Sequence, residues 1–301
     1  MRTDRKSRVT LWGGTSTQTK GFNLGEECIH GLDYGLCDAC FPKAAPEIPV
    51  AVAKPRVTRP RAVSLTAPRK APTASSLRTP VVDVGEQRIY HVTHVNNLAD
   101  ILGSGRLLAD ASEAWEKRPV VDISSAEIRE FRRTIVVSDD HDTSVASYVP
   151  FFLTPTSSVW ESVREQSADP RLSAAVRESA AADYVILVSS VRSVIDAHDA
   201  DDDDERAAAV VVTDGDAAHT LTRFATTREA GDRVLRKLRG DEESVQIRAA
   251  EYLVRDEFPF ELVTLIGVAN DRARDAVKAI VKASEFKTRV AVYPPWFMRA
   301  E

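Results

Sequence analysis

The sequence predicts an α+β fold for the part of the chain that follows residue 83. Runs rich in β-branched and aromatic residues occur among segments in which apolar residues recur at helical spacing. The two kinds of segment do not alternate strictly, whereas a doubly wound parallel sheet requires such alternation. With 43% apolar residues among 301, the chain can also bury a core.

The first predicted elements of this body are a strand, a short helix and a second helix. Residues 88–95 are β-prone and predict the strand, and Leu98, Ile101 and Leu102 then follow at helical spacing before Gly103 and Gly105. Residues 125–137 predict the second helix, with Ser125 as its N-cap and Ile128 and Phe131 on one face. Arg129, Arg132 and Arg133 then point elsewhere.

Later segments predict further strands and one more helix. Residues 147–155, 182–191 and 207–218 are apolar and β-prone, and the second is long enough for a central strand. Residues 260–268 predict a strand, and residues 270–284 a capped amphipathic helix. The acidic run from Asp196 to Glu205 lacks the spacing and glycine of a calcium loop, which predicts a solvated loop.

The region before the body divides into a small module and a linker. Residues 41–80 hold eight of the fifteen prolines and show no helical or strand period, which predicts an extended segment. We therefore predict an N-terminal zinc-binding module at 1–44, a Pro/Arg-rich linker at 45–83 and one further domain at 84–301.

Charge is distributed unevenly between these parts. Residues 1–80 carry 13 Lys and Arg against 6 Asp and Glu, although the net charge of the chain is -5. A basic arm on an acidic body can hold a polyanion near a site, and mere solubility explains it equally well. No run reaches the ~18 apolar residues of a membrane span, and the N-terminus lacks the apolar region of a secretory signal, so we expect a cytoplasmic protein without a membrane partner.

The three cysteines predict a structural zinc site. Cys28, His30, Cys37 and Cys40 form two close pairs around a turn-prone loop, and this ligand inventory suits tetrahedral zinc. Four protein ligands leave no open position for hydrolysis. The alternative is a tail with unliganded thiols. Such a module could bind nucleic acid through stacking aromatic residues, or it could bind protein.

His91 and His94 raise the question of a second metal site. On a strand, His91 and Thr93 share one face and His94 lies on the other, so the two histidines are not natural ligands of one metal. A structural role is the ordinary one for a lone histidine of this kind.

Glu251 interrupts an apolar row. If residues 244–258 form a strand, Val245, Ile247, Ala249, Glu251 and Leu253 share a face. A carboxylate in such surroundings is either paired in a salt bridge or used as a base or cation stabiliser. The pattern alone does not separate these two interpretations.

Four stretches between about Gln87 and Val268 resemble the DarT-type DNA ADP-ribosyltransferases. These toxins attach ADP-ribose from NAD to a base of single-stranded DNA. The similar stretches comprise residues 89–107, the helix at 127–133 with the strand at 147–155, the pair at 184–195 and 211–224, and residues 247–254. Residues 134–147 and 154–158 depart from the family pattern, and the N-terminal module lies outside the resemblance.

The resemblance implies an ADP-ribosyltransferase fold of split, mainly antiparallel sheets, with NAD as substrate. It also implies that His91 and Thr93 contact the nicotinamide end of NAD, that Arg132 is the active-site arginine and that Glu251 is the catalytic glutamate. A macrodomain antitoxin is the implied partner, and the protein would act as a toxin or antiphage effector. The rival predictions are an enzyme of the same fold that acts on RNA or protein, and a non-catalytic nucleic-acid-binding adaptor.

The residue types suit this chemistry. Cleavage of the nicotinamide–ribose bond passes through an oxocarbenium-like ribose, which a buried carboxylate stabilises while it accepts a proton from the attacking base. Arg132 could hold a pyrophosphate oxygen or polarise the carbonyl of the base. A single strand is the expected target because a duplex hides the base atom.

Overall fold

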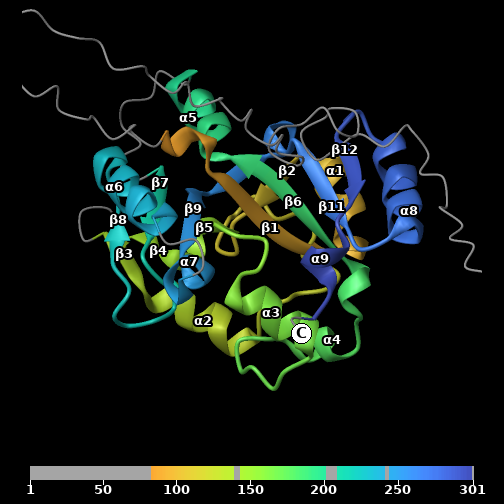
Figure 1. The fold of residues 1–301 in the computed structure, drawn as a ribbon, viewed down its shortest axis with the longest axis horizontal. Coiled ribbons are helices and arrows are strands. Elements are labelled where there is room, and N and C mark those ends of the chain that lie inside the picture. Colours follow the sequence, from red (N-terminus) through yellow and green to blue (C-terminus); the bar gives the residue numbers. More distant parts are fainter. Residues whose placement is uncertain (1–82, 139–142, 201–208, 241–243, 300–301) are drawn as a thin grey trace, which may run out of the picture. The chain divides into compact units, whose positions relative to one another are not determined.

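The structure, a computed structural model, describes residues 83–138, 143–200, 209–240 and 244–299. The predicted zinc ligands Cys28, His30, Cys37 and Cys40 lie outside the described residues, as do the predicted module and all but the last residue of the linker. Figure 1 shows the fold of the C-terminal body.

The body is built around a mainly antiparallel sheet, as the α+β prediction requires. Its eight strands follow the order β12-β11-β6-β1-β5-β9-β7-β8, and only β11 and β12 pair in parallel among the described strands. The strands are β1 (Arg88–His94), β5 (Tyr148–Phe152), β6 (Tyr184–Ser190), β7 (Val210–Thr213), β8 (Phe224–Ala225), β9 (Glu251–Arg255), β11 (Leu265–Val268) and β12 (Arg289–Val292).

The sheet is split between β1 and β5. Strand β1 pairs with β6 along its whole length, from Arg88 to His94. On its other side the register with β5 joins only Tyr90 to Phe152 among the described residues. Pro150 lies two residues before Phe152 and has no N–H with which to continue the ladder toward β1. The split is thus a short ladder within one continuous eight-stranded sheet, next to His91.

Two small sheets and nine α-helices, besides short 3-10 turns, complete the described residues. β2 (Arg106–Leu108) pairs with β10 (Glu257–Pro259), and β3 (Val136–Ser138) pairs with β4 (Thr143–Ser144). The helices are α1 (Leu98–Ser104), α2 (Ala126–Thr134), α3 (Ser158–Glu165), α4 (Ala174–Arg177), α5 (Val191–Ala200), α6 (Arg228–Arg239), α7 (Val245–Ala249), α8 (Asp271–Lys282) and α9 (Pro294–Phe297).

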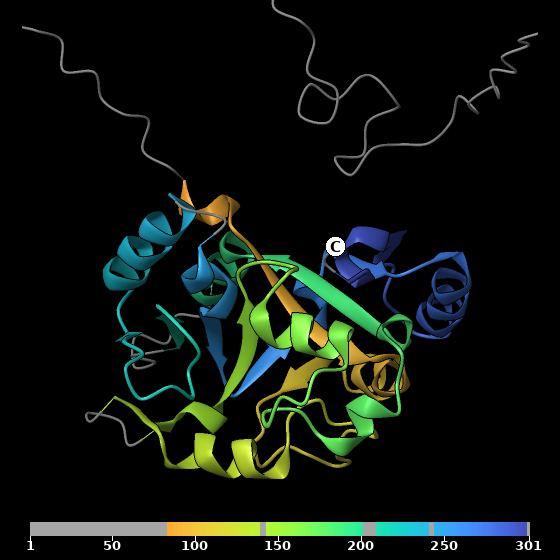
Figure 2. The same ribbon diagram turned by 60° about the horizontal axis from the view of Figure 1, so that its bottom comes forward.

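Both faces of the sheet are covered by helices (Figures 1 and 2). Residues of α1, α5, α6 and α8 pack with one face, and residues of α3, α4 and α9 pack with the other. Strand β6 contributes Leu187 to the first cluster and Ile186 to the second, and both are fully buried. This two-sided burial explains why β6 has a continuous apolar sequence in place of an alternating one.

Several predicted boundaries are confirmed by the backbone. The Ser125 hydroxyl accepts the Ile128 N–H at 3.3 Å and caps α2, and the Asn270 side chain caps α8 in the same way. Gly105 ends α1 with φ of 71°, a left-handed conformation that favours glycine, whereas Gly103 lies within the helix.

Four predicted elements are wrong in part. The helix predicted at 125–137 ends at Thr134, and Val136–Ser138 form strand β3. Residues Val245–Ala249 form helix α7, because Ser244 caps them and Ile247 is buried on one helical face. The predicted row of same-face residues from Val245 to Leu253 therefore does not exist. The acidic run is helical as far as Ala200, since Val191 and Val194 anchor α5 in the core. In the 260–268 segment, the strand begins only at Leu265.

No helix among the described residues is long and apolar enough to cross a membrane.

Candidate active site

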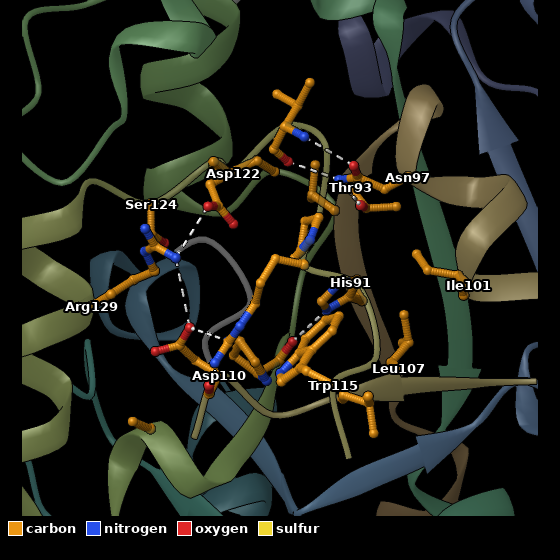
Figure 3. Close-up of a pocket in the computed structure, with 18 of the residues that line it drawn as sticks. His91, Thr93, Asn97, Ile101, Leu107, Asp110, Trp115, Asp122, Ser124 and Arg129 are labelled. Carbon is orange, nitrogen blue, oxygen red and sulfur yellow. Dashed lines mark hydrogen bonds and ion pairs between the residues drawn. The ribbon is translucent and has the colours of Figure 1, made fainter. Parts of the chain in front are cut away.

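A cavity of about 750 Å³ brings together the residues that the sequence singles out in the body. His91 and Thr93 of β1, Arg132 of α2 and Glu251 of β9 all line it. The volume lies within the ~300–1,000 Å³ range of ligand pockets. Figure 3 shows His91 and Thr93 with their neighbours along one wall.

Glu251 is the most constrained polar group of the cavity. Its side chain is only 4% exposed, and it forms a two-point pair with Arg132. Arg132 Nη1 donates to Glu251 Oε1 at 3.1 Å, and Arg132 Nη2 donates to Oε2 at 2.8 Å. A third donor, the Ala217 N–H, reaches Oε1 at 2.9 Å. The Glu251 carboxylate is thus paired in a salt bridge, which was the first interpretation of the sequence. It also lines a cavity, as a base or cation stabiliser must, which was the second.

The backbone fixes Glu251 at the first residue of β9. Its N–H donates to the Thr213 hydroxyl at 2.8 Å, which ties β9 to the end of β7. The preceding Ala250 is fully buried, and Phe152 of β5 is the register partner of Glu251. Helix α7 and strand β9 therefore meet at a rigid junction, and the carboxylate projects from it.

Arg132 and Arg133 have different partners. Arg132 contacts Glu251, whereas Arg133 Nη2 donates to Asp110 Oδ2 at 2.5 Å. Burial opposes the charge of Arg132, but the carboxylates of Glu251, Asp216 and Asp110 outweigh that effect and raise its pKa. Arg132 thus remains a fixed cation at the floor of the cavity.

His91 presents one ring nitrogen as an acceptor. The Pro150 carbonyl can only accept, so His91 Nδ1–H donates to it over 2.9 Å. Burial lowers the pKa of His91, although the bond to Pro150 opposes this shift. At neutral pH the ring is therefore neutral, and Nε2 can accept a hydrogen bond.

His94 has the structural role that the sequence favours. It is buried on the opposite face of β1, its Nδ1 accepts the Asn96 N–H at 3.2 Å, and its ring meets the Tyr184 ring edge-on at 5.1 Å. Burial lowers the pKa of His94 as well. The two histidines do not converge on one ligand position.

Asn97 is a site residue that sequence reasoning missed. Its amide donates to the Thr93 hydroxyl at 3.2 Å and to the Val121 carbonyl at 2.8 Å, and its Oδ1 accepts the Val121 N–H at 3.0 Å (Figure 3). Asn97 thus fastens the segment between β2 and α2 to the wall of the cavity. The Asn-Asn pair at the start of a helix is the only sequence signal for this role.

The rim of the cavity carries a group of arginines around one carboxylate. Asp110 lies 3.4 Å from Arg118, 3.7 Å from Arg129 and 2.5 Å from Arg133, in each case from oxygen to nitrogen. The Arg118 guanidinium also lies 5.3 Å from the centre of the Trp115 ring. Arg129 also lies 3.1 Å from Asp122, and Arg133 lies 3.7 Å from Glu130, so the three arginines meet three carboxylates. Guanidinium groups suit the oxygens of a phosphate, which would compete with these partners.

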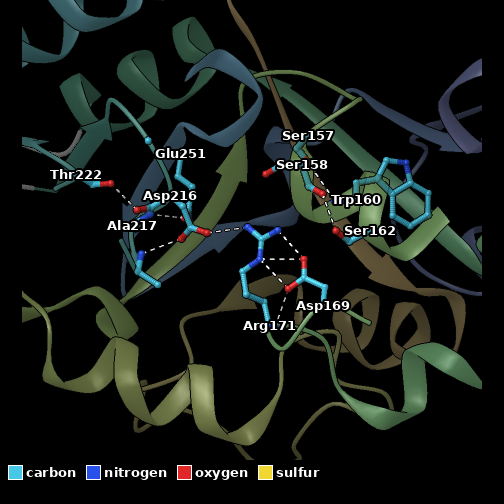
Figure 4. Close-up of polar contacts among 12 residues, drawn as sticks. Ser157, Ser158, Trp160, Ser162, Asp169, Arg171, Asp216, Ala217, Thr222 and Glu251 are labelled. Atoms are coloured by element: carbon cyan, nitrogen blue, oxygen red, sulfur yellow. Dashed lines mark hydrogen bonds and ion pairs between the residues drawn. The ribbon is translucent and has the colours of Figure 1, made fainter. Parts of the chain in front are cut away.

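A second missed group lies beside Glu251, and two of its members, Arg171 and Asp216, also line the cavity. Asp169, Arg171 and Asp216 form an ion-paired chain that reaches the loop donating to Glu251 (Figure 4). No group of three or more His, Cys, Asp or Glu side chains that could hold a metal occurs within the part of the chain that the structure describes. The described site therefore has an arginine-rich rim, a neutral histidine acceptor and a paired carboxylate.

Comparison with protein families gives one match over most of this body. Residues 90–298 match the family model described as ssDNA thymidine ADP-ribosyltransferase, DarT. A DNA ADP-ribosyl transferase of Thermus aquaticus is 29% identical over 204 residues, which are 64% of this chain and 80% of the relative. The DNA ADP-ribosyl transferase of Mycobacterium tuberculosis is 28% identical over 206 residues, 64% of this chain and 81% of that protein.

Solved structures match the same fold. The Thermus sp. 2.9 DarT in complex with ADP-ribosylated ssDNA superposes with a TM-score of 0.57 at 24% identity, over 70% of this chain and 96% of that one. The same protein in complex with NAD⁺ gives a TM-score of 0.53 at 22% identity, over 70% and 98% of the two chains.

Proposed function

Because the chain belongs to the DarT family of single-stranded-DNA thymidine ADP-ribosyltransferases, we propose that it modifies thymine and that Glu251 and Arg132 carry the chemistry. The protein is an NAD-dependent transferase that moves ADP-ribose to a base of single-stranded DNA. The observation that carries the assignment of residues is the two-point Arg132–Glu251 pair at the cavity.

NAD lies with its nicotinamide ribose near β1 in this proposal. The neutral His91 ring offers Nε2 to a ribose hydroxyl or to the carboxamide, and Thr93 lines the same wall. The arginines around Asp110 suit the diphosphate, since guanidinium groups bind phosphate oxygens in two-point geometry.

Glu251 serves two purposes during transfer. When the bond between nicotinamide and ribose C1′ breaks, nicotinamide leaves with the bonding electrons, and the negative carboxylate stabilises the oxocarbenium-like ribose. The thymine nitrogen that bears a proton in DNA then forms the new bond to C1′, and Glu251 accepts that proton. Arg132 fixes the orientation of the carboxylate before the reaction.

The target base is tested with defined oligonucleotides. Incubation with NAD should raise the mass of a single strand that contains one thymine by one ADP-ribose, whereas a matched strand without thymine should keep its mass. Transfer to the thymine-free strand alone would refute the proposed base. Parallel incubations with RNA and with protein test the rival substrates.

The N-terminal part enters the proposal as a structural zinc module. Its support is the spacing of Cys28, His30, Cys37 and Cys40 in the sequence. Metal analysis of the full chain should find one zinc per molecule, and Cys37→Ser should lose it. Zinc retained by Cys37→Ser would contradict this ligand set.

A macrodomain antitoxin is the proposed partner that reverses the modification. Its support is membership of the DarT family. A macrodomain protein encoded beside this chain should release ADP-ribose from the modified oligonucleotide and restore its original mass. A modification that resists such a protein would contradict the proposed partner.

A further inference from the structure

The loop between β7 and β8 supplies one of the donors that hold Glu251. The Ala217 N–H lies 2.9 Å from Glu251 Oε1, and Ala217 is fully buried. A backbone N–H cannot move separately from its loop. The conformation of this loop therefore sets one of the three hydrogen bonds that orient the carboxylate.

Asp216 organises that loop. Its Oδ1 accepts the Ala218 N–H at 2.9 Å, and its backbone carbonyl accepts the Thr222 hydroxyl at 2.6 Å and the His219 N–H at 2.8 Å. These contacts close the loop on both sides of Ala217. The position of Asp216 thus determines where the Ala217 N–H points.

Arg171 holds Asp216 from outside the loop. It belongs to the segment between α3 and α4, and its Nη1 donates to Asp216 Oδ2 at 2.8 Å (Figure 4). On the other edge of the guanidinium, Arg171 Nε donates to Asp169 Oδ1 at 3.0 Å and Arg171 Nη2 donates to Asp169 Oδ2 at 2.6 Å. Hydrogen bonds from Arg171 lower the pKa of Asp169 to about 2, against the opposing effect of burial. The pair is therefore ionised throughout the neutral range.

We propose that Arg171 and Asp216 are positioning residues for Glu251: Arg171 anchors Asp216, Asp216 shapes the loop, and the loop presents the Ala217 N–H to the carboxylate. This inference rests on the proposed function, in which Glu251 is the catalytic carboxylate. It assigns a task to a segment, residues 166–173, that contributes no donor to Glu251 itself.

Charge gives Arg171 a second effect. Arg132 of α2 pairs with Glu251, and the carboxylates of Asp216 and Asp110 also act on Arg132, while Arg171 pairs with Asp216. Without Arg171, Asp216 would be an unpaired anion that competes for Arg132 and disfavours a second negative charge nearby. Arg171 therefore pairs with a carboxylate that would otherwise compete with Glu251 for Arg132.

Kinetics of Arg171→Gln test the proposal. A lost hydrogen bond to a charged group costs on the order of tenfold or more in kcat, whereas the KM values for NAD and for the thymine oligonucleotide should stay within about twofold if only orientation is lost. The acidic limb of the pH–rate profile should move to higher pH. Arg274→Gln is the matched control, since Arg274 also bridges two aspartates, Asp271 and Asp275, but lies on α8 and does not line the cavity.

A double variant separates charge from loop geometry. In Arg171→Gln/Asp216→Asn the loop no longer carries an unpaired anion, whereas Asp169 has lost Arg171 in both variants. The side chains at 171 and 216 can still share a hydrogen bond, so the acidic limb should return toward its wild-type position if the anion at 216 displaced it. A limb that stays displaced in the double variant would overturn the charge effect.

Amide exchange tests the geometry without relying on catalysis. The Ala217 amide should exchange faster in Arg171→Gln than in the wild type, and it should exchange at the wild-type rate in Arg274→Gln. An Ala217 amide that exchanges at the wild-type rate in Arg171→Gln would overturn the positioning role. A raised KM for DNA with unchanged kcat would overturn it as well, because Arg171 would then be a DNA contact. If the wild type modified no oligonucleotide, the proposed function would fail, while amide exchange would still decide whether Arg171 positions the loop.

Discussion

The two halves of the split sheet hold their site residues in different ways. On the β1 half, His91 has one hydrogen bond, to Pro150, and a ring contact with Phe151 at 5.6 Å. On the β9 half, Glu251 accepts three hydrogen bonds and is almost completely buried. A group that binds a ligand tolerates small adjustments, whereas a group that acts at the reacting atom must be oriented beforehand. From this difference we expect the β1 half to bind NAD and the β9 half to carry the chemistry.

Removal of Arg132 should have the largest effect on stability and transfer, because it removes two of the three hydrogen bonds to Glu251. Arg132→Gln leaves Glu251 as a buried charge without its cation, and loss of one partner from such a pair costs about 3–5 kcal/mol in the free energy of unfolding. Transfer should also be lost. Denaturant unfolding checks the stability, and an unchanged midpoint would show that the pair contributes nothing to the fold.

Substitution of His91 should have a smaller effect, confined to binding. His91→Asn keeps a donor for Pro150 but loses the Nε2 acceptor, so the KM for NAD should rise by about 3- to 10-fold with little change in kcat. A fall in kcat with unchanged KM would place His91 in the chemistry and break the comparison between the two halves.

The pH dependence of NAD binding sharpens the role of His91. Burial holds its pKa below the usual value of 6.5, so the unfolded chain binds this proton more readily than the folded one. The neutral His91 contributes its full share to the free energy of unfolding above pH 6.5. That share is lost as the pH falls through the pKa of His91 in the folded protein, which lies below 6.5. NAD binding by the wild type should weaken over the same fall in pH, and calorimetry of His91→Asn should show no such dependence.

Substitution at the rim should change binding modestly and through charge. Arg129→Gln removes a cation that faces Asp110 and Asp122, so the KM for the substrate whose phosphate it binds should rise a few-fold. In a plot of log affinity against log salt concentration, the magnitude of the slope should fall by about one. Titration of NAD and of the oligonucleotide at several salt concentrations identifies which one this arginine serves. Unchanged salt slopes for both would exclude a direct phosphate contact.

The smallest effect is expected from a surface residue that does not line the cavity. Arg274 bridges Asp271 and Asp275 on the surface of α8, where exposed ion pairs contribute about 0–1 kcal/mol. Arg274→Gln should therefore leave the unfolding midpoint and the transfer rate within error of the wild type. A strong loss of transfer in this variant would mean that surface charge, and not the site geometry, controls the rate.

The β1 half could be predicted from sequence more completely than the β9 half. Residues 88–94 have the β-branched and aromatic composition of a strand, and alternation places His91 and Thr93 together. Before Glu251, the alternation of apolar residues wrongly predicts a strand at Val245–Ala249, where the structure has helix α7. A five-residue helix with one buried residue, Ile247, has the same apolar spacing as a short strand. Ser244, which caps α7, was the available signal.

The ion-paired chain of Asp169, Arg171 and Asp216 could not be predicted from any sequence pattern. Arg171 and Asp216 are far apart along the chain and lie in connecting segments without periodicity. Only the packing of the segment before α4 against the β7–β8 loop brings them together. Asn97 was missed for the same reason, since its partner Val121 lies in a loop.

The central claim is that Glu251 performs the chemistry while the β1 half binds NAD. The most direct test compares NAD binding by calorimetry with ADP-ribose transfer to a thymine oligonucleotide in Glu251→Gln. This change keeps the shape of the side chain and removes its charge. We predict that NAD affinity stays within a few-fold of the wild type, while the transfer rate falls by a factor on the order of 10²–10⁴ or more. Transfer at the wild-type rate would contradict the account.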